Sequence, residues 1–238
     1  MNRSPAILIR GGRERLSREQ LAELRGFCTP TIANAIETFE VRERQEGVTR
    51  AGVHCLFPGL GPMVGYACTA VIESAKPPAE PRRVARAGYW RHLEACGGDV
   101  VAVMQDLSQP PGGAYIGEVN ATIHRSLGCV GILTNGTARD LDEVRRLGFH
   151  LFAGGVEVSH GWAHLEDFGA EVQVFGLRVK PGDLIHADRH GAVVIPEQVA
   201  HLTAKAARRV ERSERPMLEA CGREDRIELL DRLIPPGY

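Results

Sequence analysis

The sequence predicts an α/β fold whose C-terminal half is rich in strands, and three features of the chain indicate it. Between residues 100 and 153, short apolar runs alternate with helix-type stretches, the rhythm of buried strands joined by helices. Residues 170–175 alternate apolar and polar side chains with period two, which is typical of a half-buried strand. Short apolar runs at 184–187 and 192–195 follow, so a β-rich layer is expected beside the strand-helix half.

Two short helices are expected first. Ser17 is followed three residues later by Gln20, which is the spacing of a capping box, so a helix is predicted over residues 17–26. Residues 29–39 open with Thr-Pro-Thr and predict a second helix. The elements expected next are a loop at 42–62, a strand at 63–74, a surface crossing at 76–81 and a helix at 82–96.

Strands and helices are then expected in alternation. The elements are a strand at 100–104, a Pro/Gly loop at 110–113, a helix at 117–127, a strand at 130–133, a turn at 135–136, a helix at 139–147 and a strand at 149–153. The last third adds strands at 170–175, 177–179, 184–187 and 192–195 and charged helices at 197–212 and 223–233. No internal repeat or linker interrupts the chain, so one domain is expected over residues 1–238.

The composition excludes several classes of protein. Of 238 residues, 43% are hydrophobic and 25% are charged, which argues against a disordered chain. The net charge of -1 argues against a generic nucleic-acid binder, which needs excess cation. No apolar run approaches the ~20 residues that span a bilayer, and the stretch 5–9 is too short for a signal peptide. We therefore expect a cytoplasmic protein with neither membrane nor nucleic-acid partners.

The six cysteines stand singly in the sequence, without a CxxC pair. A zinc site or redox motif of the familiar spacing is therefore not predicted. Several cysteines lie in apolar runs, such as those around Cys68 and Cys129, where Cys behaves as a small hydrophobe. Buried free thiols fit a reducing compartment, and no cysteine is given a catalytic role.

The first candidate binding element is Gly117-Glu118-Val119-Asn120, at the start of a predicted helix. A glycine at this junction lets a ligand approach the backbone, and the first helical N–H groups lack intrahelical acceptors. Together they form an anion site suited to a carboxylate or a phosphate. The alternative is that Gly117 only starts a helix.

The second element places Arg139 and Asp140 side by side where a strand hands over to a helix. Ligands of open α/β sheets gather outside the carboxyl ends of strands. Arginine offers a planar fork for a carboxylate, and aspartate offers a hard oxygen ligand for a divalent cation. The alternative is that Asp140 caps a helix and Arg139 is solvated. Combined with the anion site, the pair is what a metal-dependent enzyme acting on an α-keto acid needs.

These motifs carry a resemblance to a known family. Gly117-Glu118-x-x-Ala121, Gly128-x-x-Gly131 and Gly136-x-x-Arg139-Asp140 resemble the first signature of the RraA-like family. Residues 181–196, Pro-Gly-Asp-Leu-x-x-Ala-Asp-x-x-Gly-x-Val-Val-x-Pro, are similar to its second signature. The resemblance covers about residues 29–196 and leaves about 197–238 as a C-terminal helical extension. It implies an α/β/β sandwich like the swivelling phosphohistidine domain, assembled as a homotrimer or a dimer of trimers.

The family includes class II pyruvate aldolases acting on 4-hydroxy-4-methyl-2-oxoglutarate and 4-carboxy-4-hydroxy-2-oxoadipate, which also decarboxylate oxaloacetate, and a regulator that inhibits ribonuclease E. The resemblance implies that Gly117, Glu118, Val119 and Asn120 present backbone N–H groups to the substrate carboxylate. It implies that Arg139 binds the substrate and steadies the enolate. Asp140 is then the direct ligand of Mg²⁺ or Mn²⁺, with waters in the other positions, one of which Glu118 orients.

The chain departs from the family's pattern at three places. Thr134-Asn135-Gly136 stands where Val-Asp-Gly is common, His190 stands in place of a second Asp, and Asn34 replaces an Asp. These departures leave the metal ligand and the arginine in place and bear on the identity of the substrate.

Three histidines are further candidates for lining the site. His160 and His164 have the i, i+4 spacing that on a helix could hold a soft metal or shuttle protons. Gly161 between them argues against a firm helix, and a solvated loop is the alternative. His190 stands beside Gly191, and its alternative is an ordinary turn.

Two functions from different classes are therefore expected to compete. The first is a divalent-metal-dependent lyase that cleaves a C–C bond in a small 2-oxo acid, or removes a β-carboxylate as CO₂. The second is a non-catalytic ring that binds and inhibits a ribonuclease. Dinucleotide and nucleoside cofactors are not predicted, because no GxGxxG turn follows an early strand.

Overall fold

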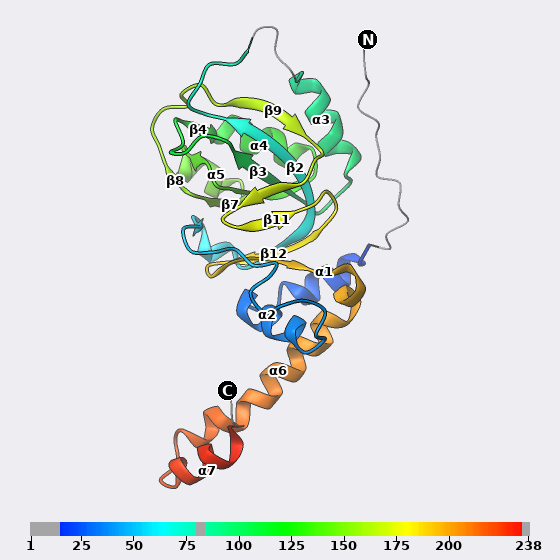
Figure 1. The fold of residues 1–238 in the computed structure, drawn as a ribbon, viewed down its shortest axis with the longest axis vertical. Helices are drawn as coiled ribbons and strands as arrows, with labels where there is room; N and C mark the ends of the chain where they lie inside the picture. The colour runs from blue at the N-terminus through cyan, green and yellow to red at the C-terminus, as the bar shows by residue number, and fades with distance from the viewer. Residues whose placement is uncertain (1–14, 80–83, 235–238) are drawn as a thin grey trace.

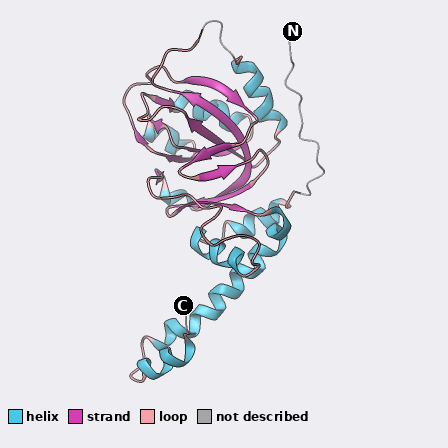
Figure 2. Ribbon diagram, viewed as in Figure 1, coloured by secondary structure: helices cyan, strands magenta, loops and turns pink. Residues whose placement is uncertain are grey.

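The computed structural model describes residues 15–79 and 84–234 and shows a mixed sheet that carries helices (Figures 1 and 2). The α-helices are α1 (Arg18–Leu24), α2 (Thr29–Glu37), α3 (Arg86–Ala95), α4 (Glu118–Ser126), α5 (Leu141–Arg146), α6 (Ala200–Ala220) and α7 (Arg226–Leu233), with 3-10 turns at Pro58–Leu60 and Glu197–Val199. The strands are β1 (His54–Cys55), β2 (Met63–Glu73), β3 (Val100–Asp106), β4 (Ala114–Ile116), β5 (Cys129–Thr134), β6 (Thr137–Ala138), β7 (His150–Ala153), β8 (Gly155–Val156), β9 (His164–Phe168), β10 (Val172–Val174), β11 (Leu177–Val179), β12 (Leu184–Asp188) and β13 (Gly191–Ile195).

The large sheet has the order β1-β7-β5-β3-β2-β12-β13, and β9 pairs with β2 beyond β12. Strands β2, β3, β5 and β7 run parallel to one another, as strands joined by crossover helices do. β1, β9, β12 and β13 are each antiparallel to their neighbours. The sheet is therefore mixed, and it curls until it is nearly closed (Figure 1).

The apolar run of β3 explains how the layers are held together. Its alternate residues point to opposite faces, so Val100, Ala102 and Met104 pack against the core beneath α3, α4 and α5. Val101 and Val103 belong to a second core, which the β10–β11 hairpin covers. Both faces of β3 are buried, which is why apolar and polar residues do not alternate along this strand. The layers are thus helices, large sheet and a further β layer.

A third core joins the chain's beginning to its end. Leu21 and Leu24 of α1 and Ile32 of α2 pack with Ile195 of β13 and Ala207 of α6. The first half of α6 is held in this way against the body of the molecule. Its second half and α7 extend away from the sheet (Figure 1).

A smaller sheet prepares the site. It consists of three short parallel strands in the order β4-β6-β8. Helix α4 follows β4 after one residue, and α5 follows β6 after two residues. The ends of these strands therefore place the starts of two helices close together.

The predicted α/β fold is confirmed, and the capping box is present. Ser17 Oγ accepts the Gln20 N–H at 3.3 Å, and Gln20 Oε1 accepts the Ser17 N–H at 2.8 Å. The strand predicted at 63–74 is β2, and the one at 130–133 is β5. The stretch 5–9 and part of the crossing and helix predicted at 76–96 lie outside the described residues.

Other elements differ from the prediction, each for a physical reason. The strands at 184–195 do not stand apart from the strand-helix half, because β12 pairs with β2 in the same sheet. Residues 164–168 form β9, since pairing with β2 supplies the hydrogen bonds that their sequence does not announce. Helix α6 continues through Pro216 to Ala220, because strong helix formers surround the proline. None of the helices in the described ranges combines the length and apolar character needed to cross a membrane.

Candidate functional site

The three short parallel strands end at one edge and bring three sequence segments together there. Ala138 pairs with Ile116 on one side and with Val156 on the other. Beyond those ends, the Arg139 N–H donates to the Ile116 carbonyl at 2.8 Å, and the Glu157 N–H donates to the Ala138 carbonyl at 3.0 Å. The two motifs that the sequence singles out, at 117–120 and 139–140, therefore meet in space.

Gly117 allows this meeting because it has no side chain. A Cβ atom at this position would lie 2.4 Å from Asp140 Oδ2 and 3.1 Å from Arg139 Cγ. The backbone of Gly117 is extended, so any residue could adopt its dihedral angles. The glycine thus does more than start a helix, because the side chains of Arg139 and Asp140 occupy the space that a Cβ atom at Gly117 would need.

Asp140 adopts an unusual conformation and does not cap the helix that follows it. Its φ of 54° and ψ of 45° are left-handed, and its side chain makes no capping bond to α5. Asp140 Oδ2 instead accepts the N–H of Glu118, at the start of α4, at 3.0 Å. A non-glycine residue in this region is uncommon and indicates a constrained position.

The Arg139 side chain accompanies that carboxylate. Its Nε lies 3.7 Å from Asp140 Oδ2, and the two side chains are 37% and 39% exposed. The pair is therefore close enough for electrostatic attraction yet open to a ligand from solvent. An exposed ion pair of this kind contributes only about 0–1 kcal/mol to the free energy of unfolding. This contribution alone does not account for the left-handed backbone of Asp140.

The start of α4 offers further donors. The N–H groups of Val119 and Asn120 belong to the first turn, where no intrahelical carbonyl is available. The Asn120 side chain donates to the Tyr115 carbonyl at 2.6 Å and so holds the turn between β4 and α4. The Glu118 side chain is exposed. The helix start therefore presents backbone donors next to a guanidinium, a combination that binds carboxylates.

The donor set fits a hard divalent cation. Asp140 offers a partly exposed carboxylate, and the exposed residue Glu118, whose backbone N–H that carboxylate accepts, lies at the start of α4. Mg²⁺ and Mn²⁺ prefer oxygen ligands, and Mg²⁺ keeps several waters when the protein supplies one or two carboxylates. The residues present thus suit the ion that the family resemblance implies.

Glu157 was not predicted as a site residue. It follows β8 in register with Arg139, which follows β6, and its Oε2 accepts the Thr137 hydroxyl at 3.0 Å. The sequence signal is weak, because the Gly155–Val156 strand has only two residues. Pairing of β8 with β6, which is a tertiary event, brings the Glu157 backbone next to Ala138, the residue before Arg139.

A partly buried pair of hydrogen bonds supports the turn that leads to Arg139. Asn135 Oδ1 accepts the Asp106 N–H at 2.8 Å, and Asn135 Nδ2 donates to the Asp106 carbonyl at 2.9 Å. An ionised aspartate at position 135 could not donate the second bond, so the asparagine has a structural reason here. Burial raises the pKa of the Asp106 carboxyl, although hydrogen bonds from Ser74 and Ser108 oppose the rise.

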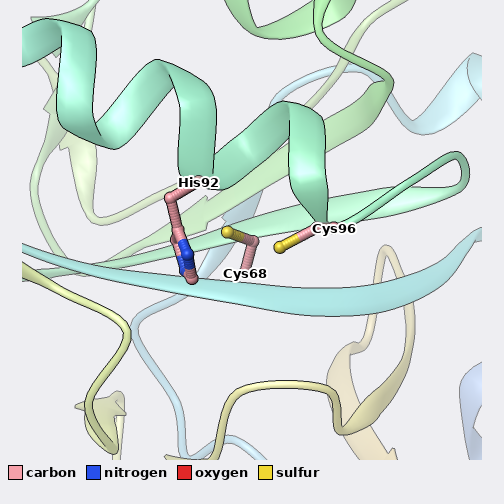
Figure 3. A group of neighbouring side chains, drawn as sticks. All are labelled: Cys68, His92 and Cys96. Carbon is pink, nitrogen blue, oxygen red and sulfur yellow. The ribbon is translucent and has the colours of Figure 1, made fainter. Parts of the chain in front are cut away.

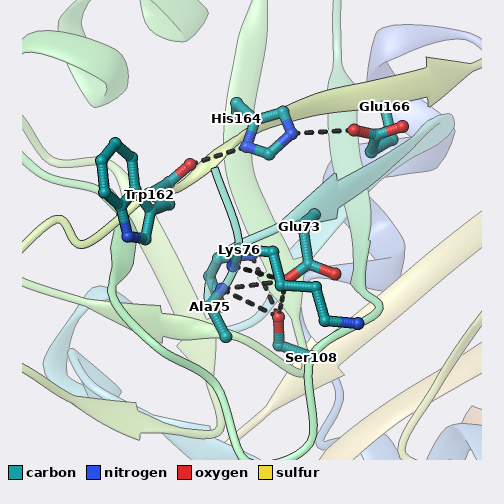
Figure 4. Close-up of polar contacts among 8 residues, drawn as sticks. Glu73, Ala75, Lys76, Ser108, Trp162, His164 and Glu166 are labelled. Carbon is teal, nitrogen blue, oxygen red and sulfur yellow. Dashed lines mark hydrogen bonds and ion pairs between the residues drawn. The ribbon is translucent and has the colours of Figure 1, made fainter. Parts of the chain in front are cut away.

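The structure does not gather the three candidate histidines at Arg139. His160 lies in a loop next to Gly113, at the beginning of β4, whereas Arg139 lies beyond its end. His164 lies in β9, where its Nδ1 bonds the Trp162 carbonyl at 2.6 Å and its Nε2 bonds Glu166 at 2.8 Å (Figure 4). The two residues do not share a helix face, so the i, i+4 spacing has no consequence here.

Beside the hydrogen-bonded pair His164 and Glu166 lies a second polar cluster, centred on Glu73. Glu73, which pairs with His164 across β2 and β9, accepts the Ser108 hydroxyl and the N–H groups of Ala75 and Lys76 (Figure 4). The hydrogen bond from Ser108 lowers the pKa of the Glu73 carboxyl, and the two backbone donors add to this. These bonds secure the loop that leaves β2.

His190 lies at the opposite end of the large sheet. It follows β12, whose residue Ala187 pairs with Met63 at the beginning of β2. Its Nδ1 lies 3.0 Å from Asp188 Oδ1. Burial would raise the pKa of Asp188, but hydrogen bonds from His190 and Thr29 lower it overall. Among the residues that the structure describes, no hydrogen bond joins His160, His164 or His190 to Arg139 or Asp140.

Comparison with known proteins places this geometry in context. A protein of Halalkalibacterium halodurans named "Putative 4-hydroxy-4-methyl-2-oxoglutarate aldolase" is 27% identical over 143 residues, which are 54% of this chain and 67% of the relative. An uncharacterized protein from Pseudomonas syringae pv. tomato has a similar structure, with a TM-score of 0.70, 22% identity and coverage of 96% of this chain and 98% of that one.

A third similar protein is RraAS2 of Streptomyces coelicolor, described as an unusual member of the RNase ES inhibitor RraA protein family. Its TM-score is 0.65 with 24% identity, and the match covers 85% of this chain and 96% of that one. At these identities the two solved structures support the fold alone. The model of the family described as RraA-like: Aldolase/RraA matches residues 29–194, which include the whole site around Gly117, Arg139 and Asp140. The chain therefore belongs to the RraA-like family.

Proposed function

We propose that this protein is a divalent-metal-dependent carbon–carbon lyase that cleaves a 4-hydroxy-2-oxo acid to release pyruvate, or decarboxylates an oxaloacetate-type acid. The observation that carries the proposal is the packing of Asp140 and Arg139 into the space left by Gly117, against the start of α4. A relative described as an aldolase supports the reaction class.

Each residue has a role that follows from its chemistry. Asp140 would hold Mg²⁺ or Mn²⁺, with Glu118 orienting a bound water. When bound, such an ion supplies Lewis acidity toward the substrate's keto oxygen. Arg139 binds the substrate and balances the negative charge that develops during cleavage. The backbone N–H groups of Val119 and Asn120 hold the substrate carboxylate in a fixed orientation.

A substrate panel tests the proposal. The purified protein is mixed with 4-hydroxy-2-oxo acids or oxaloacetate and Mg²⁺ or Mn²⁺, and pyruvate is measured with a coupled dehydrogenase. The wild-type chain is expected to release pyruvate, and Asp140→Ala is expected to lose at least about a hundredfold in rate, because the metal ligand is gone. Asp142→Ala, an exposed carboxylate on α5, is the matched control and should retain the rate. Unchanged turnover in Asp140→Ala, or in chelator, contradicts the assigned role.

The other function of the family is a defined outcome of a second test. If the protein is the proposed lyase, calorimetric titration with Mg²⁺ and oxalate, a pyruvate analogue, should detect binding of both to it. Absence of a heat of binding in that titration, together with recovery of a ribonuclease in a pull-down, would support the non-catalytic regulator instead.

We also propose that a second copy of the chain covers the face around the site in a homotrimer or dimer of trimers. Three valines beside the site support this: Val119 is 72% exposed, Val156 is 53% exposed and Val158 is 95% exposed. β8 is the last strand of its small sheet, so its outer edge has no strand paired to it in the described chain. Apolar side chains and an open strand edge together favour association.

A further inference from the structure

Three soft ligand groups meet between α3 and β2, away from the proposed active site. One ligand atom each from Cys68, His92 and Cys96 lies within 4.8 Å of the other two (Figure 3). His92 and Cys96 are four residues apart at the end of α3, so they lie on one face of the helix. Cys68 comes from β2, beneath that face (Figure 3).

The group is enclosed, and one of its atoms lacks a partner. Cys68 is 0% exposed and Cys96 is 7% exposed. The Nε2 atom of His92 is buried and has no hydrogen-bond partner within the described ranges. The His92 ring packs against Phe168 with centroids 5.1 Å apart, so its surroundings there are apolar. A buried imidazole nitrogen without a partner is costly, and a bound ligand would satisfy it.

We propose that Cys68, His92 and Cys96 form a binding site for a zinc-class ion that ties α3 to β2. Two thiolates and an imidazole are ligands of Zn²⁺ and similar borderline or soft ions, whereas Mg²⁺ takes oxygen ligands. On binding, the ion forms two metal–sulfur bonds and one metal–nitrogen bond, and the two thiols release their protons to solvent. Three protein ligands leave one tetrahedral position for a water.

The site escapes sequence reasoning because its residues are far apart. Cys68 precedes His92 by 24 residues, and His92-x-x-x-Cys96 does not have the CxxC spacing of familiar zinc motifs. Packing of α3 on β2 creates the group. The inference is independent of the proposed lyase activity, since it uses none of the residues at Arg139 and Asp140.

Cobalt(II) is the probe for the test, because its spectrum reports sulfur ligands and tetrahedral geometry. Cys28 and Cys221 are exposed and are first replaced by Ser to remove surface thiols. The resulting chain, kept reduced, is titrated with Co²⁺ alone. We expect one equivalent to bind with a sulfur-to-cobalt charge-transfer band, and Zn²⁺ to abolish that band by displacement.

Ligand variants and matched controls decide the assignment. His92→Gln should weaken Co²⁺ binding about tenfold or more and reduce the rise in melting temperature that Zn²⁺ gives the parent chain. His92 lies partly at the surface, so this variant should fold without metal, which circular dichroism checks. His54→Gln, a change at an exposed histidine, should bind Co²⁺ as the parent does.

Three outcomes would overturn the proposal. One is the absence of a charge-transfer band in the parent chain. Another is equal affinity in the parent and His92→Gln. The third is loss of the band in Asp140→Ala, which would show that the thiols do not bind the ion independently of the other site. Retention of the band in Asp140→Ala supports a separate site whether or not the protein is a lyase.

Discussion

Gly117 shapes the candidate site through the atoms it lacks. Its missing Cβ leaves room for Asp140 Oδ2 and for the stem of Arg139, and the Glu118 N–H then holds the carboxylate at 3.0 Å. A side chain here would displace the two groups on which the proposed chemistry depends, while the extended backbone would tolerate it.

Gly117→Ala should therefore keep the fold and lose activity. We expect pyruvate release to fall about a hundredfold, since a displacement of about 1 Å can cost that much, with a small change in melting temperature. Gly155→Ala is the control, because a Cβ there would meet only Thr137 Cγ2, at 3.8 Å. Equal activity in the two variants would show that the packing around Gly117 is irrelevant to function.

His124 is a buried histidine whose proton position follows from its neighbours. Its Nδ1 lies 2.6 Å from the Asn120 carbonyl, which can only accept, so Nδ1 carries the proton. Its Nε2 then accepts the Tyr89 hydroxyl at 3.0 Å. Burial lowers the pKa of His124 to about 4, although the bond to Asn120 opposes this.

The shift predicts acid destabilisation. In the unfolded chain this histidine is protonated below its usual pKa of 6.5. In the folded chain it is protonated only below a pKa of about 4. The free energy of unfolding should therefore fall as pH decreases from 6.5 to 4, by at most ~1.4 kcal/mol per pH unit from this residue. Urea unfolding across that range measures it. His124→Gln should make the dependence less steep, with His150, whose pKa burial also lowers to about 4, still contributing. A change at the exposed His201 should leave the dependence as in wild type, and the reverse pattern would refute the assignment.

At the scale of elements, short strands position the site, and a short capped helix begins the described fold. β4, β6 and β8 contain two or three residues each, yet their parallel pairing aligns the ends that carry the site. Helix α1 is just as short, with seven residues, and depends on its capping box and on the burial of Leu21 and Leu24. Isolated helices of this length are unstable, so such local and tertiary contacts decide whether they form.

Ser17→Ala tests the contribution of the cap. Loss of the hydroxyl leaves the Gln20 N–H without its acceptor, so the free energy of unfolding should fall by about 1 kcal/mol. Thermal denaturation should show this as a decrease of about 2–4 °C. Ser213→Ala, which removes a hydroxyl bonded to Val210 within its own helix, should have little effect. No difference between the two variants would mean that α1 does not need its cap.

At the scale of the whole molecule, the exposed valines near the site support the assembly that we propose. Val158, two residues after β8, is 95% exposed, and Val119, in the first turn of α4, is 72% exposed. Exposure of these apolar side chains to water is unfavourable in a monomer, and a second copy that covers them removes that exposure.

Light scattering after size-exclusion chromatography tests this assembly. The wild-type chain should have the mass of three or six copies, and Val158→Glu should shift it toward the monomer, because a charge is costly at a dry interface. Leu218→Glu places the same charge at an exposed leucine of α6 and should leave the mass unchanged. A wild-type monomer at all concentrations would rule out the trimer.

Much of the fold and part of the site could be predicted locally. The apolar run of β3, the capping box at Ser17 and the glycine before α4 are signals carried by neighbouring residues. Other features had no local signal. β9 forms through its pairing with β2, and the backbone of Glu157 lies beside Ala138 only because β8 pairs with β6.

The sequence by itself determined the α/β class, the order of most elements and the two motifs that carry the candidate chemistry, because periodicity, caps and glycines act over a few residues. Only the tertiary structure decided which groups meet. It joined Gly117 to Asp140, separated His160, His164 and His190 from Arg139, and brought Cys68 to His92 and Cys96. The physical reason is that strand pairing and core packing connect residues far apart in the chain, and no local pattern records those contacts.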